Sequence, residues 1–203
     1  MMSTPDKLNN FVHAFGAARL LLQKANEEGA LLEGMALYAA MTDGFLRIGL
    51  VLKRQMVKNT MDIEDVLISQ EKNGQYHTER KIQRMAREEG VITQKIFDEL
   101  SELYDRRNDA IHKFFLTDIQ YADLPPFLER YEVMYETLKQ IIYDLEEEQI
   151  SKGVGMSGSS NVTKDDTLRM LRNITMKIDS KAAGGKVVQA KSDERGQRHL
   201  GVL

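Results

Sequence analysis

The sequence contains no cysteine, and this absence removes several classes of chemistry at once. A chain without thiols has no disulfide scaffold, no thiolate metal site and no cysteine nucleophile. Proline is also scarce, with three residues in 203, and aromatic residues make up only 7%, which is low for an all-β domain. Residues that favour helices dominate the first 150 positions instead. We therefore expect an all-α fold.

Two further absences bear on where the protein acts. Residues 1–6 show neither a basic nor an apolar leader region, so no secretory signal is visible. The longest apolar stretch, 30–52, is interrupted by Glu33, Asp43 and Arg47, which predicts a buried helix and not a membrane span. We expect a cytoplasmic protein that makes no membrane contact. The net charge of −3 gives no overall attraction to nucleic acid.

Helical periodicity and capping residues predict a bundle over residues 1–150. The expected helices are 4–28 with Thr4 as N-cap, 30–58, a weak short helix near 62–68, 78–89 capped by Thr78, 94–116 capped by Thr93, and a last helix from about 123 to 150. Gly34, Gly44 and Gly49 in the second helix are expected to allow close helix approach. Four long helices with short to moderate loops predict a bundle of four to five helices.

The composition changes after Ile150, and we expect three further segments. Residues 151–162 are rich in glycine and serine and predict a flexible linker. Residues 163–181 predict an amphipathic helix, and residues 182–203 a disordered tail. The apolar stripe of that helix consists of Leu168, Leu171, Ile174 and Ile178. It must dock on its own bundle, on a second copy or on a partner protein.

Basic residues gather in three clusters although the chain as a whole is acidic. The clusters are Arg47, Lys53, Arg54 and Lys58; Arg80, Lys81, Arg84 and Arg87; and Arg106, Arg107 and Lys113. The plainer interpretation is that they form solvated helix faces. Clusters that converge on one face would instead bind a polyanion such as RNA.

The expected helix over 94–116 carries the most unusual residue pattern in the chain. Its apolar stripe consists of Ile96, Leu100, Leu103, Ala110 and Phe114, and Arg107 falls in phase with it. A guanidinium on an apolar stripe needs a carboxylate, a second subunit or an anion, because an unpaired buried charge is costly. Asp43 is one candidate carboxylate. His112 lies five residues on, about 140° around the helix, so Arg107 and His112 do not converge on one helix.

The segment Arg107-Asn108-Asp109-Ala110-Ile111-His112 resembles the motif of HEPN domains. These are small helical bundles whose ribonuclease members carry an arginine, often a polar residue directly after it, and a histidine four to six residues beyond. The resemblance covers roughly residues 6–150, with specificity in the motif alone. One departure is Phe114, which stands where toxins paired with nucleotidyltransferase antitoxins carry a tyrosine, so modification of a tyrosine there is not available to this chain.

The resemblance implies an endoribonuclease that needs no metal or other cofactor, of the kind that belongs to toxin–antitoxin or phage-defence systems. His112 would act as general base or acid, Arg107 would stabilise the phosphorane, and Asn108 would position one of them. Arg106, Lys113, Lys53 and Arg54 are candidate RNA-binding residues. The motif arginine and histidine would meet across a homodimer axis, and the 163–181 helix would suit a protein inhibitor or partner. Two alternatives stay open: a non-catalytic RNA- or protein-binding module, and an unrelated interaction protein with Arg107 paired internally.

Overall fold

The structure, a computed structural model, describes residues 3–70 and 76–158. Within them it contains α-helices, two short 3-10 helices and no strand, which confirms the all-α prediction. In chain order the elements are α1 (Thr4–Glu28), α2 (Leu31–Lys58), α3 (Asp65–Ile68), α4 (Glu79–Glu88), α5 (Gln94–His112), η1 (Phe114–Leu116), η2 (Tyr121–Asp123), α6 (Pro125–Lys152) and α7 (Gly155–Gly158).

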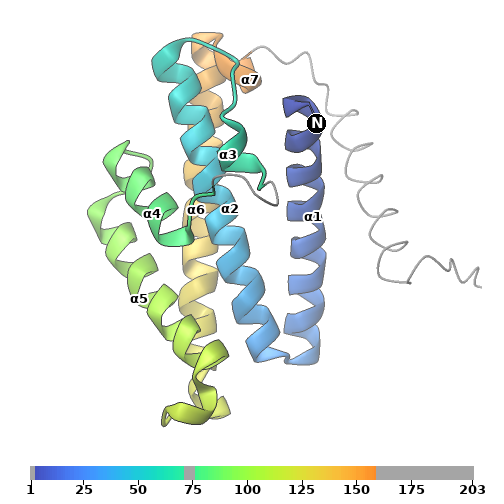
Figure 1. Ribbon diagram of the computed structural model, residues 1–203, viewed down its shortest axis with the longest axis vertical. Coiled ribbons are helices and arrows are strands. Elements are labelled where there is room, and N and C mark those ends of the chain that lie inside the picture. The colour runs from blue at the N-terminus through green and yellow to red at the C-terminus, as the bar shows by residue number, and fades with distance from the viewer. Residues whose placement is uncertain (1–2, 71–75, 159–203) are drawn as a thin grey trace, which may run out of the picture.

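The long helices α2 and α6 run side by side through the centre of the bundle, and they share its largest helix–helix interface. Figure 1 shows α1 on one side of this pair, and α4 and α5 on the other. The close packing uses glycine: a Cβ at Gly49 would lie 2.6 Å from Val91 Cγ1, and one at Gly44 would lie 2.9 Å from Phe15 Cε2. The prediction that these glycines allow close approach is therefore confirmed.

The core divides into two clusters along the length of the central pair. One packs the C-terminal half of α2 against α3, α4 and the C-terminal half of α6. The other, which includes Tyr38, Leu103 and Tyr131, joins the N-terminal halves of α2 and α6 to the C-terminal half of α5. By length and composition α2 would suffice to cross a membrane, and 67% of its most apolar 18-residue window is buried inside the bundle. Burial of this kind is what the core helix of a bundle requires.

The predicted starts of α4 and α5 are confirmed by hydrogen bonds at the caps, whereas α5 ends at His112 and not near residue 116 as predicted. The hydroxyls of Thr78 and Thr93 accept from the backbone N–H groups of Lys81 and Ile96 at the starts of α4 and α5. The first helix differs: its N-cap is Ser3, which accepts from the Asp6 N–H, and not Thr4. A side chain before the first helical residue is the better cap because the chain there is still extended.

The helices around the expected linker also differ from the prediction. Ser151 and Lys152 belong to α6, and residues 155–158 form α7, which packs on α2 and α6. The bundle therefore continues past the boundary expected at residue 150. The rest of the 151–162 segment, the 163–181 helix and the 182–203 tail lie outside the described residues.

Candidate functional site

The candidate site lies on the C-terminal half of α5. Leu100, Leu103 and Ala110 are buried against the rest of the bundle, and Arg107 stands in the same row at helical spacing. The expectation that this guanidinium is drawn toward the core is confirmed, since only 17% of the side chain is exposed. The helix face that contributes apolar side chains to the core therefore also places the Arg107 guanidinium there.

Arg107 is held by three groups. Its Nη1 lies 2.9 Å from Glu79 Oε2 on α4, and the Glu79 side chain is only 18% exposed. Its Nη2 donates to Asn108 Oδ1 at 3.0 Å. The guanidinium carbon lies 4.8 Å from the centre of the Tyr104 ring, which adds a cation–π contact. These contacts fix both the position and the plane of the guanidinium.

A second ion pair, between Asp43 and Arg47, lies beside the first. Asp43 Oδ2 accepts from Arg47 Nε at 2.6 Å within α2, and Arg47 also donates to the backbone carbonyls of Leu67 and His77. Asp43, one candidate carboxylate for Arg107, is therefore paired with Arg47, and Glu79 pairs with Arg107 instead. Asp43 still interacts electrostatically with Arg107, so two acids and two arginines form one balanced cluster.

Burial shifts the titration of both acids in this cluster. Desolvation raises the pKa of Glu79 above the ordinary glutamate value, and the positive charge of Arg107 opposes this shift. Desolvation likewise raises the pKa of Asp43, against the opposing charge and hydrogen bond of Arg47. In both acids, burial raises the pKa by more than the neighbouring arginine lowers it. The charged pairs are consequently held in place at a cost in desolvation, as is usual for buried ion pairs.

Asn108 and His112 differ sharply in their surroundings. Asn108 is half-buried and touches Arg107 through its side-chain oxygen. His112 is exposed and is the last residue of α5. Within residues 3–70 and 76–158 no hydrogen bond or ion pair joins His112 to Arg107 or Asn108. The structure therefore brings Arg107 and Asn108 together and leaves His112 apart in a single copy.

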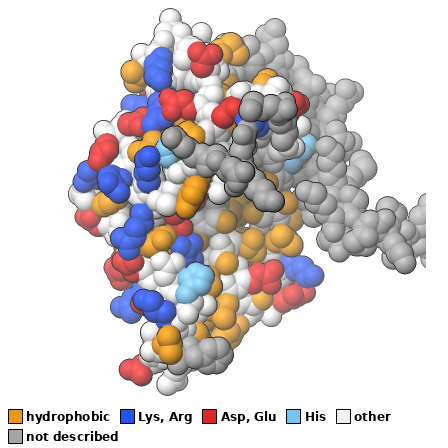
Figure 2. Space-filling model, in the orientation of Figure 1, with side chains coloured by type: hydrophobic (Ala, Val, Ile, Leu, Met, Phe, Trp, Pro, Cys, Tyr) orange, Lys and Arg blue, Asp and Glu red, His pale blue; other side chains and the backbone are white. Residues whose placement is uncertain are grey.

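The predicted RNA-binding residues fall at opposite ends of the bundle. Arg106 lies with its guanidinium 5.5 Å from the Phe127 ring, and Lys113 pairs with Asp109 at 3.1 Å, both near the C-terminal end of α5. Lys53 and Arg54 lie near the C-terminal end of α2, at the other end in Figure 1. Arg54 is engaged by Glu89 and Glu64. Figure 2 shows acidic and basic side chains interspersed over α4 and α5, so the basic clusters do not merge into one face in this view.

Glu79 is the functional candidate that the sequence did not reveal. It directly follows the N-cap Thr78 and so reads as an ordinary acidic residue of a first helical turn, where the helix dipole favours it. Only the packing of α4 across α5 brings its carboxylate to Arg107. The sequence showed only that Arg107, on an apolar stripe, required a carboxylate, a second subunit or an anion.

Comparison of the chain with family models, with curated proteins and with solved structures gave no match. The resemblance to HEPN domains therefore rests on the motif of α5 and its helical setting.

Proposed function

We propose that this protein is a HEPN-like endoribonuclease that cleaves RNA without a metal ion and acts as a homodimer. In the reaction the ribose 2′-oxygen attacks the adjacent phosphorus, and the bond from phosphorus to the 5′-oxygen breaks. The products are a 2′,3′-cyclic phosphate and a free 5′-hydroxyl. His112 accepts the 2′-hydroxyl proton or supplies the proton to the leaving 5′-oxygen. Arg107 donates hydrogen bonds to the phosphorane oxygens.

The observation that carries this proposal is the way Arg107 is anchored. A guanidinium has five N–H groups, of which Glu79 and Asn108 each engage one. Each terminal nitrogen thus keeps a further N–H group that has no bond within the described residues. A planar donor with a fixed orientation and spare N–H groups is suited to a phosphate, because no reorganisation is needed when charge develops.

The homodimer follows from the separation of Arg107 and His112. Arg107 turns toward Glu79 on α4, whereas His112 is exposed at the end of α5. About 140° of helix rotation separates them. A two-fold axis that brings two α5 helices together would place two arginines and two histidines along one cleft. We therefore assign the active form to a dimer and expect sedimentation at micromolar concentration to show it.

A second candidate function is a non-catalytic module that binds RNA or protein. One observation favours it, and favours the unrelated interaction protein equally: the charge of Arg107 is already matched by Glu79, as in a purely structural ion pair. In that case His112 is an ordinary exposed side chain at a binding surface. The type of cellular system in which either function would operate, such as toxin–antitoxin or phage defence, follows from the resemblance alone.

The deciding experiment is RNA cleavage by the full chain and its His112→Ala variant, on mixed single-stranded and structured RNA in EDTA. We expect wild-type cleavage with cyclic-phosphate ends and a loss of about 10²–10⁴-fold in His112→Ala, because alanine cannot carry a proton. His13→Ala is the matched control and should cleave normally, since His13 lies on α1. Full activity in His112→Ala would end the catalytic proposal. RNA binding by a dimeric wild-type protein that cleaves nothing would favour the second candidate.

A further inference from the structure

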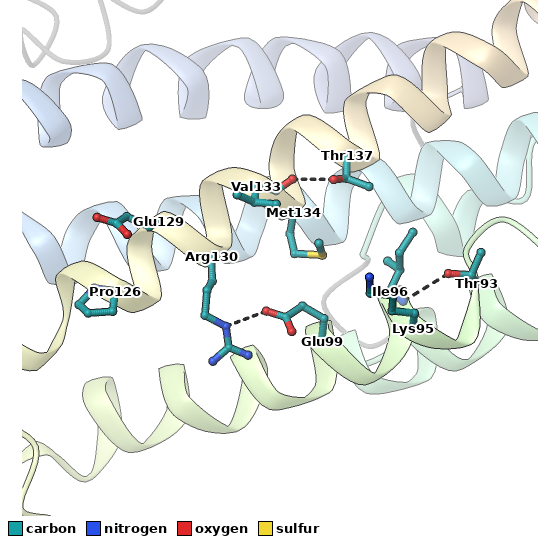
Figure 3. Close-up of a pocket in the computed structure, with 10 residues that line it drawn as sticks. All are labelled: Thr93, Lys95, Ile96, Glu99, Pro126, Glu129, Arg130, Val133, Met134 and Thr137. Carbon is teal, nitrogen blue, oxygen red and sulfur yellow. Dashed lines mark hydrogen bonds and ion pairs between the residues drawn. The ribbon is translucent and has the colours of Figure 1, made fainter.

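A groove of about 630 Å³ runs between α5 and α6, away from the Arg107 site. Ile96 lines it from α5, and Pro126, Val133 and Met134 line it from α6 (Figure 3). Its surface is mostly apolar, and the side chain of Val133 is 60% exposed. Because the α5 residues of the groove lie in the first third of that helix, the groove is separate from Arg107 and His112. An inference about it is independent of the proposed function.

The charged side chains in and directly beside the groove have a small excess of acids. Arg130 lies between the two helices and donates to Glu99 at 2.7 Å and to Glu102 at 2.8 and 3.0 Å (Figure 3 shows the bond to Glu99). Glu129 and Lys95 complete the charged set. The lining itself therefore has two acids and two bases, and Glu102, which lies beside the groove and binds Arg130, adds a third acid. Glu129 is exposed and has no ion pair within the described residues, so the groove offers an apolar surface with one free carboxylate at its rim.

The chain itself contains a segment that matches this surface. Residues 168–178, which lie outside the described residues, carry the apolar stripe of the expected helix and include three basic residues and no acid. At about 100° per residue, Arg172 falls beside Leu168 at one border of the stripe and Lys177 beside Met170 at the other. A helix of this pattern presents apolar side chains flanked by positive charge, which complements an apolar groove with an acidic excess.

The length of the expected helix matches that of the groove, and the connecting chain is long enough to reach it. The eleven positions from Pro126 to Thr137 along the groove span about 16 Å, and the ten positions from 168 to 178 span about 15 Å as a helix. The described chain ends at Gly158, beside Gln149, because the Ser157 N–H donates to Gln149 Oε1. Gln149 is about 18 Å along α6 from Thr137. Residues 159–162 reach about 13 Å when extended, and residues 163–167 add about 7 Å as the start of the helix, so together they cover this distance.

We propose that residues 163–181 dock as a helix into the α5–α6 groove of their own chain. Leu168 lies toward Thr137 and Ile178 toward Pro126, because the segment enters from the α7 end. Apolar side chains of the segment cover Val133 and Met134, and Arg172 or Lys177 faces Glu129. Docking removes an apolar stripe and an apolar groove from water together, which stabilises both.

The absence of cysteine in the native chain allows a clean test by thiol cross-linking. The full chain would carry Val133→Cys and Ile174→Cys and be treated with a short bis-maleimide at submicromolar concentration. The matched control pairs Ile174→Cys with Leu21→Cys, an exposed apolar position on α1. We expect the groove pair to form an intramolecular cross-link on the order of tenfold faster than the control, because docking raises the effective concentration. Equal rates would overturn the proposal.

Two further readouts separate the possible occupants. Cross-links formed mainly between differently tagged copies would show that the groove takes a second chain, and would also overturn the proposal. Glu129→Arg should slow cross-linking of the groove pair severalfold, and Arg172→Glu or Lys177→Glu in the same chain should restore it, because one of these swaps returns the opposite charges to facing positions. If neither reversal restores the rate, the assigned orientation is wrong.

Discussion

Glu79 on α4 holds Arg107 on α5 through an ion pair of 2.9 Å, in which each side chain is less than one fifth exposed. This relationship decides how substitutions at Arg107 must be interpreted. Removal of the arginine leaves a carboxylate in a poorly solvated position, so a loss of stability accompanies any loss of activity. The activity of an Arg107 variant can therefore be interpreted only when the loss of stability caused by the unpaired Glu79 carboxylate is measured separately.

A double-mutant cycle provides this control. Arg107→Met should lower the free energy of unfolding by about 3 kcal/mol, because it leaves Glu79 buried and unpaired. Glu79→Leu combined with Arg107→Met should recover most of that loss, because an apolar pair of similar volume requires no desolvation of charge. Urea unfolding of the wild type, both single variants and the double variant measures the coupling. Strictly additive effects would contradict the view that the pair acts as a unit.

The pH dependence of the Arg107→Met variant follows from the pKa of Glu79. Burial already raises this pKa, and Arg107 is the main group that lowers it, so the variant should raise it further. A carboxyl whose pKa is higher in the native than in the unfolded state takes up its proton first in the native state. The protonated carboxyl therefore stabilises the native state, and this stabilisation is lost as pH rises through the native pKa and regained as pH falls.

We accordingly expect the stability deficit of Arg107→Met to shrink between neutral pH and the mildly acidic range. Urea unfolding of the variant and of the wild type at several pH values measures the deficit. Carbon-13 NMR titration of the glutamate carboxyls locates the pKa of Glu79 in both proteins. A deficit that stays constant with pH would show that it does not arise from the buried Glu79 charge.

Local residue patterns predicted the helices, since a cap or an apolar stripe depends on neighbours three or four positions away. Thr78 and Thr93 cap their helices as expected because the cap is a contact within one turn. The need of Arg107 for a partner could be predicted for the same reason. The identity of that partner could not, because Glu79 reaches Arg107 only through the register in which α4 crosses α5. Asp43, the candidate that the sequence offered, pairs with Arg47 instead.

The turn after α6 shows a second limit of local patterns. Glycine and serine around residue 155 predicted a flexible linker, yet these residues fold back on the bundle. Two buried glutamines organise them. Gln149 donates to the Leu52 carbonyl and to Gln55 Oε1, each at 3.0 Å, and accepts from the Ser157 N–H at 3.0 Å, and Gln55 Oε1 accepts from the Met156 N–H at 3.1 Å. Composition describes a segment on its own and contains no information about a partner side chain on another helix.

Gln149→Leu tests this arrangement. The leucine fills a similar volume but leaves the Ser157 N–H and Gln55 Oε1 without this partner, so we expect the protein to lose about 2–3 kcal/mol of stability. The amides of Met156 and Ser157 should exchange with solvent faster. Gln140→Leu is the matched control, because Gln140 is exposed and bonds to Asp144 within the same helix; it should change stability by no more than about 0.5 kcal/mol. Unaltered exchange at Met156 and Ser157 would show that other contacts hold α7.

Arg107→Lys separates the structural role of Arg107 from the proposed catalytic one. Lysine keeps a positive charge within reach of Glu79, so we expect most of the stability to be retained, with a loss of about 1 kcal/mol from the missing hydrogen bond to Asn108. The ammonium does not reproduce the planar fork that donates two parallel bonds to a phosphate. Cleavage should therefore fall by about 10²–10³-fold, the effect of removing a donor that stabilises developing charge. The measurement is the single-turnover cleavage rate of the folded variant beside its unfolding free energy, with Arg19→Lys, at an exposed position on α1, as the control. A fully active Arg107→Lys protein would mean that only the charge toward Glu79 matters, and the assignment of Arg107 to the phosphorane would then be wrong.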